Sequence, residues 1–219
     1  MKKILYWIHS RHKNFWTKEN IFSLFVGVIL FLIALYLQKV ADGYVVRTGG
    51  TVVGDVLLDN IPALDIDGVI IFNTLMFSLV AIIMFILKPK FILFAIKSLA
   101  LFIMIRAFFI SLTHLGISPH QIVFEPSTLG FWLYDTFFNS SNDFFFSGHT
   151  WLPFLMALVF YHEKHWRYIY FAISIVFGIS VLIAHIHYSI DVFAAPFITY
   201  SIFSIARILF KRDYKLVVS

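Results

Sequence analysis

Long runs of apolar residues, separated by short polar segments, make up most of the chain. A helix needs about 20 apolar residues to cross the hydrocarbon core of a bilayer. Six stretches come close to this length or reach it, and we predict a transmembrane helix in each: residues 21–37, 68–87, 91–112, 144–161, 168–184 and 190–210. The pattern therefore predicts an all-α membrane protein with one six-helix transmembrane domain over residues 21–210.

The composition agrees with a lipid environment. Of the 219 residues, 60% are hydrophobic and 13% are charged, whereas a soluble domain is roughly half apolar and a quarter charged. The chain has no cysteine, which excludes disulfides, thiolate metal sites and a cysteine nucleophile. It carries no nucleic-acid-binding motif, so we expect the membrane, and not nucleic acid, as its partner.

Basic and acidic side chains are divided between alternate connections of the predicted helices. By the positive-inside rule, the basic segments face the cytosol and the acidic loops face the outer side of the membrane. Both termini are then cytosolic. The N-terminal segment is an amphipathic lead-in on the membrane surface, and the C-terminal segment is a basic tail. The basic segments are 1–20, 88–90, 164–167 and 211–219, and the acidic loops are 38–67 and 113–143.

Several ionisable residues lie within or next to the predicted helices, where they are costly and tend to be functional. His149 lies about one turn below the outer end of the fourth helix. His187 and Asp191 lie at the outer junction of the fifth and sixth helices. Arg106 lies in the outer half of the third helix, and Asp65 precedes the second. We therefore expect these five groups to share one layer near the outer leaflet.

The chemistry of these groups is complementary. His187 and Asp191 are four residues apart, a spacing that places both on one helical face if the sixth helix starts early enough. A carboxylate there can orient an imidazole and stabilise its charged form, which suits a nucleophile or a general base. His149 offers a second acid–base group, and Arg106 offers planar donors suited to phosphate.

The start of the fourth predicted helix adds further candidates. Ser147, Gly148 and the first N–H groups of this helix form an expected anion site. Asp143 is either a helix N-cap or a group that orients His149 or a substrate head group.

Two segments resemble the paired motifs of sphingomyelin synthases, within the type 2 phosphatidic acid phosphatase superfamily. Asp143–Thr150 reads Asp-Phe-Phe-Phe-Ser-Gly-His-Thr, and His187–Asp191 reads His-Tyr-Ser-Ile-Asp. Pro62–Asp65 is similar to the first motif of that family, and Arg106 with its downstream Thr113 and Pro119 is similar to the second. Together these matches cover residues 60–200.

The resemblance implies a six-helix fold with its active site at the outer leaflet. It implies that His187, aided by Asp191, attacks a lipid phosphorus to give a phosphohistidine. His149 would protonate the leaving group and later deprotonate the acceptor. The implied substrate is a phospholipid, the acceptor is water or a second lipid such as ceramide or diacylglycerol, and no metal or cofactor is implied. Whether the protein forms a homo-oligomer stays open.

The chain also departs from this superfamily. The Lys-x6-Arg-Pro element of the soluble and bacterial phosphatases is missing, so Arg106 would have to replace it. The long cytosolic N-terminal domain of animal sphingomyelin synthases has no counterpart. We therefore expect a compact enzyme of the bacterial inner membrane, with its site facing the periplasm or the exterior.

Other interpretations stay open for several residues. A metal-binding or metal-transporting protein would use the outer histidines together with Asp191. Arg106 could pair helices, and Asp65 and Glu125 could be simple loop acids. His185 is two residues from His187 and would face away from it on a helix, in a structural or a substrate-binding role. The outer histidines are His114, His120, His149, His185 and His187.

Overall fold

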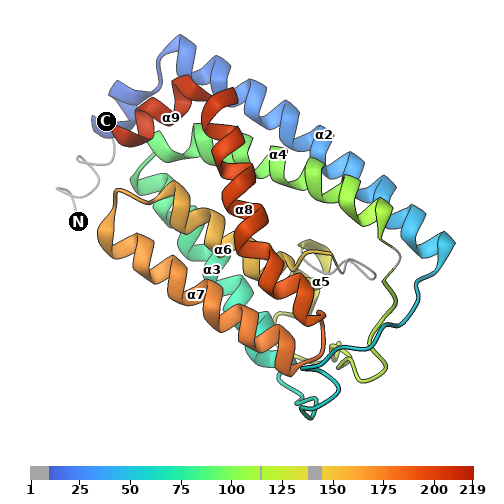
Figure 1. The fold of residues 1–219 in the computed structure, drawn as a ribbon. Coiled ribbons are helices and arrows are strands. Elements are labelled where there is room, and N and C mark those ends of the chain that lie inside the picture. The colour runs from blue at the N-terminus through green and yellow to red at the C-terminus, as the bar shows by residue number, and fades with distance from the viewer. Residues whose placement is uncertain (1–9, 114, 138–144) are drawn as a thin grey trace.

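The computed structural model describes residues 10–113, 115–137 and 145–219, and within them the fold is entirely helical (Figure 1). Residues 10–15 are helical and precede α2. No β-strand occurs in these three segments. The helices are α2 (Lys18–Thr48), α3 (Asp67–Leu87), α4 (Lys90–Leu112), α5 (Phe131–Phe137), α6 (Gly148–Val159), α7 (Lys164–Ile183), α8 (Ser189–Leu209) and α9 (Lys211–Val218).

Five helices of the described chain are long and apolar enough to cross a membrane, namely α2, α3, α4, α7 and α8. The all-helical membrane fold predicted from hydropathy is thereby confirmed. The predicted fourth span is represented by α6, which has 12 residues and contains Pro153. A helix of that length rises about 18 Å, well short of a hydrocarbon core of about 30 Å. The number of spans, six, therefore stays a prediction.

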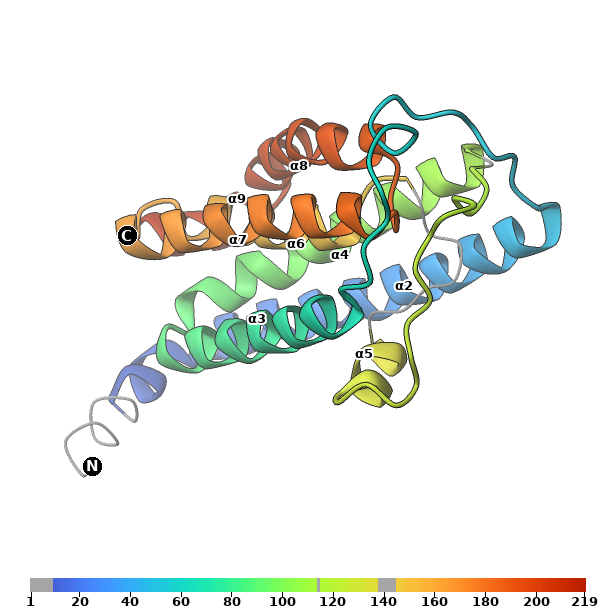
Figure 2. The same cartoon turned by 90° about the horizontal axis from the view of Figure 1, so that it is seen from below.

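The helices pack around α4. Figures 1 and 2 show α2 running alongside α4, and this is the most extensive helix pair in the described chain. The short α6 packs against α7 and α8, so it is enclosed by longer helices. Stacked aromatic rings fill the interior, with ring centroids 3.7 Å apart for Phe102 and Trp151 and 4.2 Å apart for Phe91 and Phe160.

Two elements differ from the sequence-based expectation. Helix α2 continues to Thr48, although its polar residues from position 38 onward suggested a loop. Gln38 donates a hydrogen bond of 2.8 Å to Asp42 one turn later, which stabilises these polar residues within the helix. Helix α5 was not predicted, because seven residues are too few to give a hydropathy signal.

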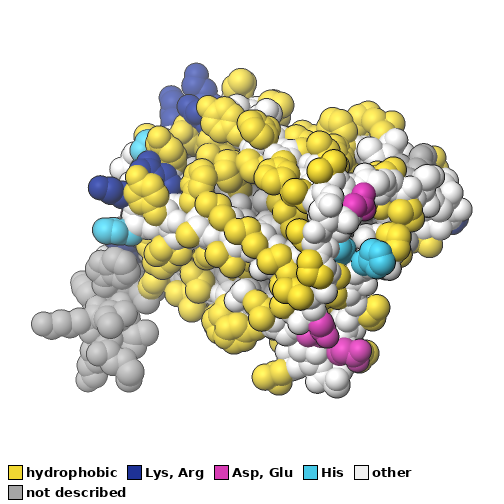
Figure 3. Space-filling model, turned by 60° about the horizontal axis from the view of Figure 1, so that its bottom comes forward, with side chains coloured by type: hydrophobic (Ala, Val, Ile, Leu, Met, Phe, Trp, Pro, Cys, Tyr) yellow, Lys and Arg dark blue, Asp and Glu magenta, His cyan; other side chains and the backbone are white. Residues whose placement is uncertain are grey.

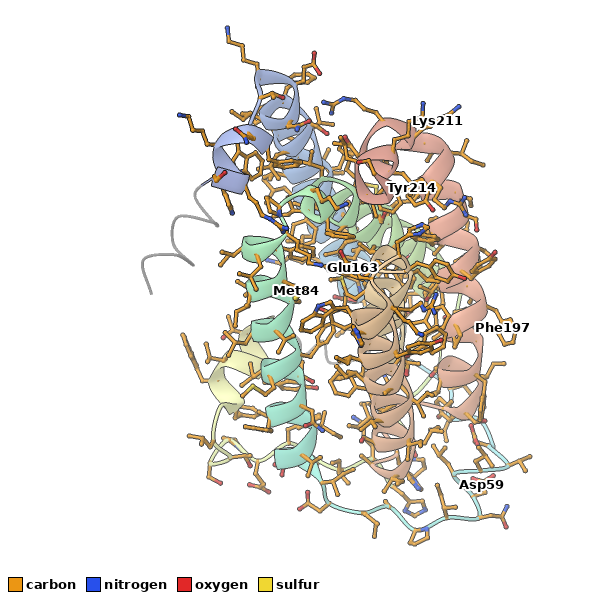
Figure 4. The ribbon with its side chains drawn as sticks, turned by 90° about the vertical axis from the view of Figure 1, so that its left-hand side faces the viewer. Asp59, Met84, Glu163, Phe197, Lys211 and Tyr214 are labelled. Carbon is orange, nitrogen blue, oxygen red and sulfur yellow. The ribbon has the colours of Figure 1, made fainter. Side chains whose placement is uncertain are left out.

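Opposite ends of the bundle carry opposite charge. In the face shown in Figure 3, Lys and Arg side chains gather at the upper left, and acidic side chains lie toward the right and below. Figure 4 places Lys211 and Tyr214 of α9 at one end and Asp59 at the other. This separation agrees with the division of charge seen along the sequence.

The C-terminal residues form a docked helix, α9. Asp213 is 2% exposed and pairs with Lys97 of α4, with 2.5 Å between Nζ and Oδ2. Ser23 of α2 donates to both carboxylate oxygens, at 2.9 and 2.8 Å. A buried ion pair with added hydrogen bonds therefore joins α2, α4 and α9.

At the other end, the long connections are bound to one another. The N–H of Gly116 donates to the carbonyl of Thr51 at 2.8 Å. A Cβ atom on Gly50 would lie 2.4 Å from the carbonyl oxygen of Leu115, so only glycine permits this close approach. The Tyr188 hydroxyl donates to the Gly116 carbonyl at 3.0 Å. These contacts fix the connections over the ends of α7 and α8.

Candidate active site

Two histidines face each other at this end of the bundle. His149 is the second residue of α6, and His187 lies in the turn between α7 and α8. Their ring centroids are 6.3 Å apart. The structure thus brings together two side chains that are 38 positions apart in the sequence.

Asp191 lies beside His187. The distance from His187 Nδ1 to Asp191 Oδ2 is 3.7 Å, and the two side chains are 5% and 0% exposed. The N–H of Tyr188 donates to the same carboxylate oxygen at 3.1 Å, the reach-back that an acidic residue makes in the first turn of a helix. Because Nδ1 faces Asp191, Nε2 is the His187 nitrogen on the far side from the carboxylate.

The start of α6 is held against the start of α8. The N–H of Ser147 donates to the carbonyl of Asp191 at 3.2 Å. Ser147 is fully buried, and its hydroxyl accepts a hydrogen bond of 3.2 Å from Thr150. Gly148 follows as the first residue of α6. The predicted anion site thus lies at the junction of the two helices, with the Ser147 N–H already engaged.

Arg106 is also part of this region. Its side chain is 5% exposed, and its Nε donates to the carbonyl of Phe146 at 2.9 Å. Its charge interacts with both His149 and Asp191. Four of the five groups expected to share one layer, Arg106, His149, His187 and Asp191, therefore lie in one neighbourhood.

Other predicted residues have different surroundings. Asp65 is exposed, and its Oδ1 accepts a local hydrogen bond of 3.4 Å from the N–H of Asp67. Asp143 lies outside the described residues. Glu125 is an exposed residue of the loop before α5. Asp65 and Asp143 stay predictions as site residues.

His185 has an unusual environment. It is 1% exposed, and its φ of 54° is in the left-handed region, which non-glycine residues rarely adopt. Its ring centroid lies 6.3 Å from that of His120. Neither ring nitrogen has a hydrogen-bond partner among the described residues. The backbone turn, and not a helix, determines the direction of this side chain.

The metal-site alternative concerns the outer histidines together with Asp191. Within the described part of the chain, no three His, Asp or Glu side chains come together as a ligand set. His114, one of the residues suggested for such a site, lies outside the described residues.

Two residues of this region were missed by sequence reasoning. Tyr134 of α5 places its hydroxyl 3.0 Å from Nε2 of His149. Asp55 is 8% exposed and accepts a hydrogen bond of 2.6 Å from the N–H of Ser189, the first residue of α8. Burial by itself would raise the pKa of Asp55, but hydrogen bonds, first from Ser189 and then from Leu58, outweigh it and hold this pKa below its ordinary value.

Comparison with known families gives one match. Residues 140–208 match the family model described as PAP2 superfamily C-terminal. The matched segment contains both resembling motifs, and it supports membership of the PAP2 superfamily and a phosphatase-type enzyme in the membrane. No curated protein matches the chain. No solved structure matches it either.

Proposed function

We propose that the protein is an integral membrane lipid phosphatase or phosphotransferase that cleaves a lipid phosphate ester, with a mechanism like that of sphingomyelin synthases. One observation carries this proposal: His149 and His187 face each other at 6.3 Å, with Asp191 beside His187. Two imidazoles and a carboxylate supply a nucleophile, an orienting anion and an acid–base group. The match to a phosphatase superfamily supports the same chemistry.

In the first step, Nε2 of His187 attacks the phosphorus. The new P–N bond forms as the P–O bond to the leaving alcohol breaks, and protonated His149 gives its proton to the leaving oxygen. Asp191, on the Nδ1 side of His187, stabilises the positive charge that develops on the ring. Arg106 provides positive charge beside the phosphate.

In the second step, an acceptor hydroxyl attacks the phosphohistidine. His149, now neutral, takes the proton of that hydroxyl, the P–N bond breaks, and His187 is regenerated. Water as acceptor gives hydrolysis, whereas a lipid hydroxyl such as that of ceramide or diacylglycerol gives transfer. Transfer requires that water be kept from the intermediate.

The charge pattern supports a topology for this enzyme. Positive residues favour the cytosolic side, which assigns both termini and α9 to the cytosol. The acidic loops and the three proposed catalytic residues then face the outer leaflet, at the periplasmic or exterior surface of a bacterial inner membrane.

A lipid screen tests the proposed activity. Purified protein is incubated with phosphatidic acid, a lipid pyrophosphate, and phosphatidylcholine with and without ceramide or diacylglycerol, and both released phosphate and new lipids are followed. We expect turnover of at least one substrate, its loss in His187→Ala, and its retention in His162→Ala, a matched change at an exposed histidine in the turn before α7. Full activity of His187→Ala would refute the proposed nucleophile.

A further inference from the structure

Tyr134 makes a direct contact with the proposed acid–base group. Its hydroxyl lies 3.0 Å from Nε2 of His149, and the two rings are nearly parallel, 6.0 Å apart with an interplanar angle of 25°. Tyr134 is 1% exposed, and its ring packs against Phe124 with centroids 4.9 Å apart. Helix α5 thus presents one fixed hydroxyl to His149.

The Tyr134 hydroxyl can form a hydrogen bond with the imidazole of His149 in either protonation state. A phenol can donate one hydrogen bond and can also accept, so it can donate to a neutral Nε2 or accept from a protonated one. Burial raises the pKa of Tyr134, which keeps the phenol neutral. The other ring nitrogen of His149, Nδ1, is buried and has no hydrogen-bond partner within the described residues.

We propose that Tyr134 is a positioning residue that engages Nε2 of His149 and leaves Nδ1 as the nitrogen that exchanges a proton with the substrate. The inference rests on the proposed function. In the first step, the proton on Nδ1 passes to the leaving oxygen while Nε2–H stays bonded to the Tyr134 oxygen. In the second step, Nδ1 accepts the proton of the attacking hydroxyl, so His149 returns to its starting state.

The groups that face this pair determine the direction of the expected pH effect. His187 and Arg106 act on His149 by their charge, and Asp135 acts on Tyr134. Asp191 lies behind His187. The Tyr134→Phe change leaves these charges in place and removes one acceptor of the Nε2 proton. The imidazolium loses stabilisation, so the pH-rate limb that belongs to His149 shifts to lower pH.

A pair of Tyr→Phe variants tests this role. Tyr170 is the matched control, because it is also fully buried but its hydroxyl has no partner in the described part of the chain. We expect kcat of Tyr134→Phe at neutral pH to fall about ten- to a hundredfold, the range for losing a hydrogen bond to a charged group. KM should change little, and Tyr170→Phe should keep the wild-type profile. An unshifted pH profile in Tyr134→Phe would overturn the proposal.

A second measurement does not require turnover. In ¹⁵N-histidine NMR spectra, the signals absent from a His149→Gln variant belong to His149, and their titration gives its protonation state in wild type and in Tyr134→Phe. A downward shift of that titration supports the role of Tyr134 even if no tested lipid is cleaved. An unchanged titration rejects this role. If the wild-type protein cleaves no lipid phosphate ester, that result would instead count against the proposed function.

Discussion

The carboxylate of Asp55 accepts a hydrogen bond of 2.6 Å from the N–H of Ser189, although the two residues are 134 positions apart in the sequence. Ser189 is the first residue of α8, and Asp191 is the third. Asp55, which lies in the long connection after α2, therefore accepts a hydrogen bond from the first N–H group of α8, the helix that carries Asp191. The geometry of the site depends on a loop as well as on the packed helices.

Replacing Asp55 should lower stability. Asp55→Ala removes the acceptor for Ser189 and for the N–H groups of Leu57 and Leu58. Loss of a helix cap lowers the free energy of unfolding by about 1 kcal/mol. Thermal unfolding in detergent should show a lower Tm than in wild type, while Glu125→Gln, at an exposed acid of the same end, should not. Equal Tm values for all three proteins would contradict the role of Asp55.

The lowered pKa of Asp55 also predicts that the stability of the protein depends on pH. Its pKa is below the ordinary value in the folded protein, because hydrogen bonds outweigh the effect of burial. Its contribution is therefore fully present above the ordinary pKa of about 4 and is lost as the pH falls through the folded-state pKa. The Tm difference between wild type and Asp55→Asn should be largest near neutral pH and should shrink in acid. A difference that is constant with pH would disprove this linkage.

Asp191→Asn should remove the negative charge beside His187 without unfolding the start of α8. The amide oxygen of asparagine can still accept the hydrogen bond from the Tyr188 N–H, so the start of α8 should stay intact. The negative charge beside His187 is lost, and kcat should fall about a hundredfold to ten-thousandfold, the usual contribution of acid–base assistance. Circular dichroism and Tm serve as controls for folding. Near-wild-type kcat in a folded Asp191→Asn protein would remove Asp191 from the mechanism.

The ion pair between Lys97 and Asp213 should be important for stability. Both side chains are buried, 9% and 3% exposed, and a buried charge without its partner costs about 3 to 5 kcal/mol. Asp213→Asn should therefore lower the free energy of unfolding strongly. The double variant Lys97→Met with Asp213→Leu should be less harmful than the sum of the two single changes, because no buried charge remains. Strictly additive effects in denaturant titrations would argue against this coupling.

Hydropathy was sufficient to predict most of the long helices. The predicted span 91–112 corresponds to α4, Lys90–Leu112, and 190–210 corresponds to α8, Ser189–Leu209. The end of α2 was missed because polar and charged residues after position 37 suggested a loop, whereas Gln38 and Asp42 hydrogen-bond to each other within the helix. Helix α5 was missed because its seven residues are too few to form a long apolar run.

The site was predicted only in part, for a related reason. His149, His187 and Asp191 appear in short motifs, and the alternation of helix directions places them at one end. Tyr134 and Asp55 act through contacts with residues far away in the sequence. Neither has a local pattern that distinguishes it from other tyrosines and acids in the loops. Only the folded chain shows what they touch.

The length of α2 has a consequence for the choice of membrane. Its exposed large apolar side chains extend from Ile21 to Val46, a rise of about 38 Å, whereas an average hydrocarbon core is about 30 Å thick. In an average bilayer, this helix must tilt or the surrounding acyl chains must stretch. Because α2 packs along α4, which carries Arg106, a mismatch between α2 and the bilayer thickness would affect both helices. Lipid acyl-chain length thus becomes a variable that acts on the protein through a helix without any of the proposed catalytic residues.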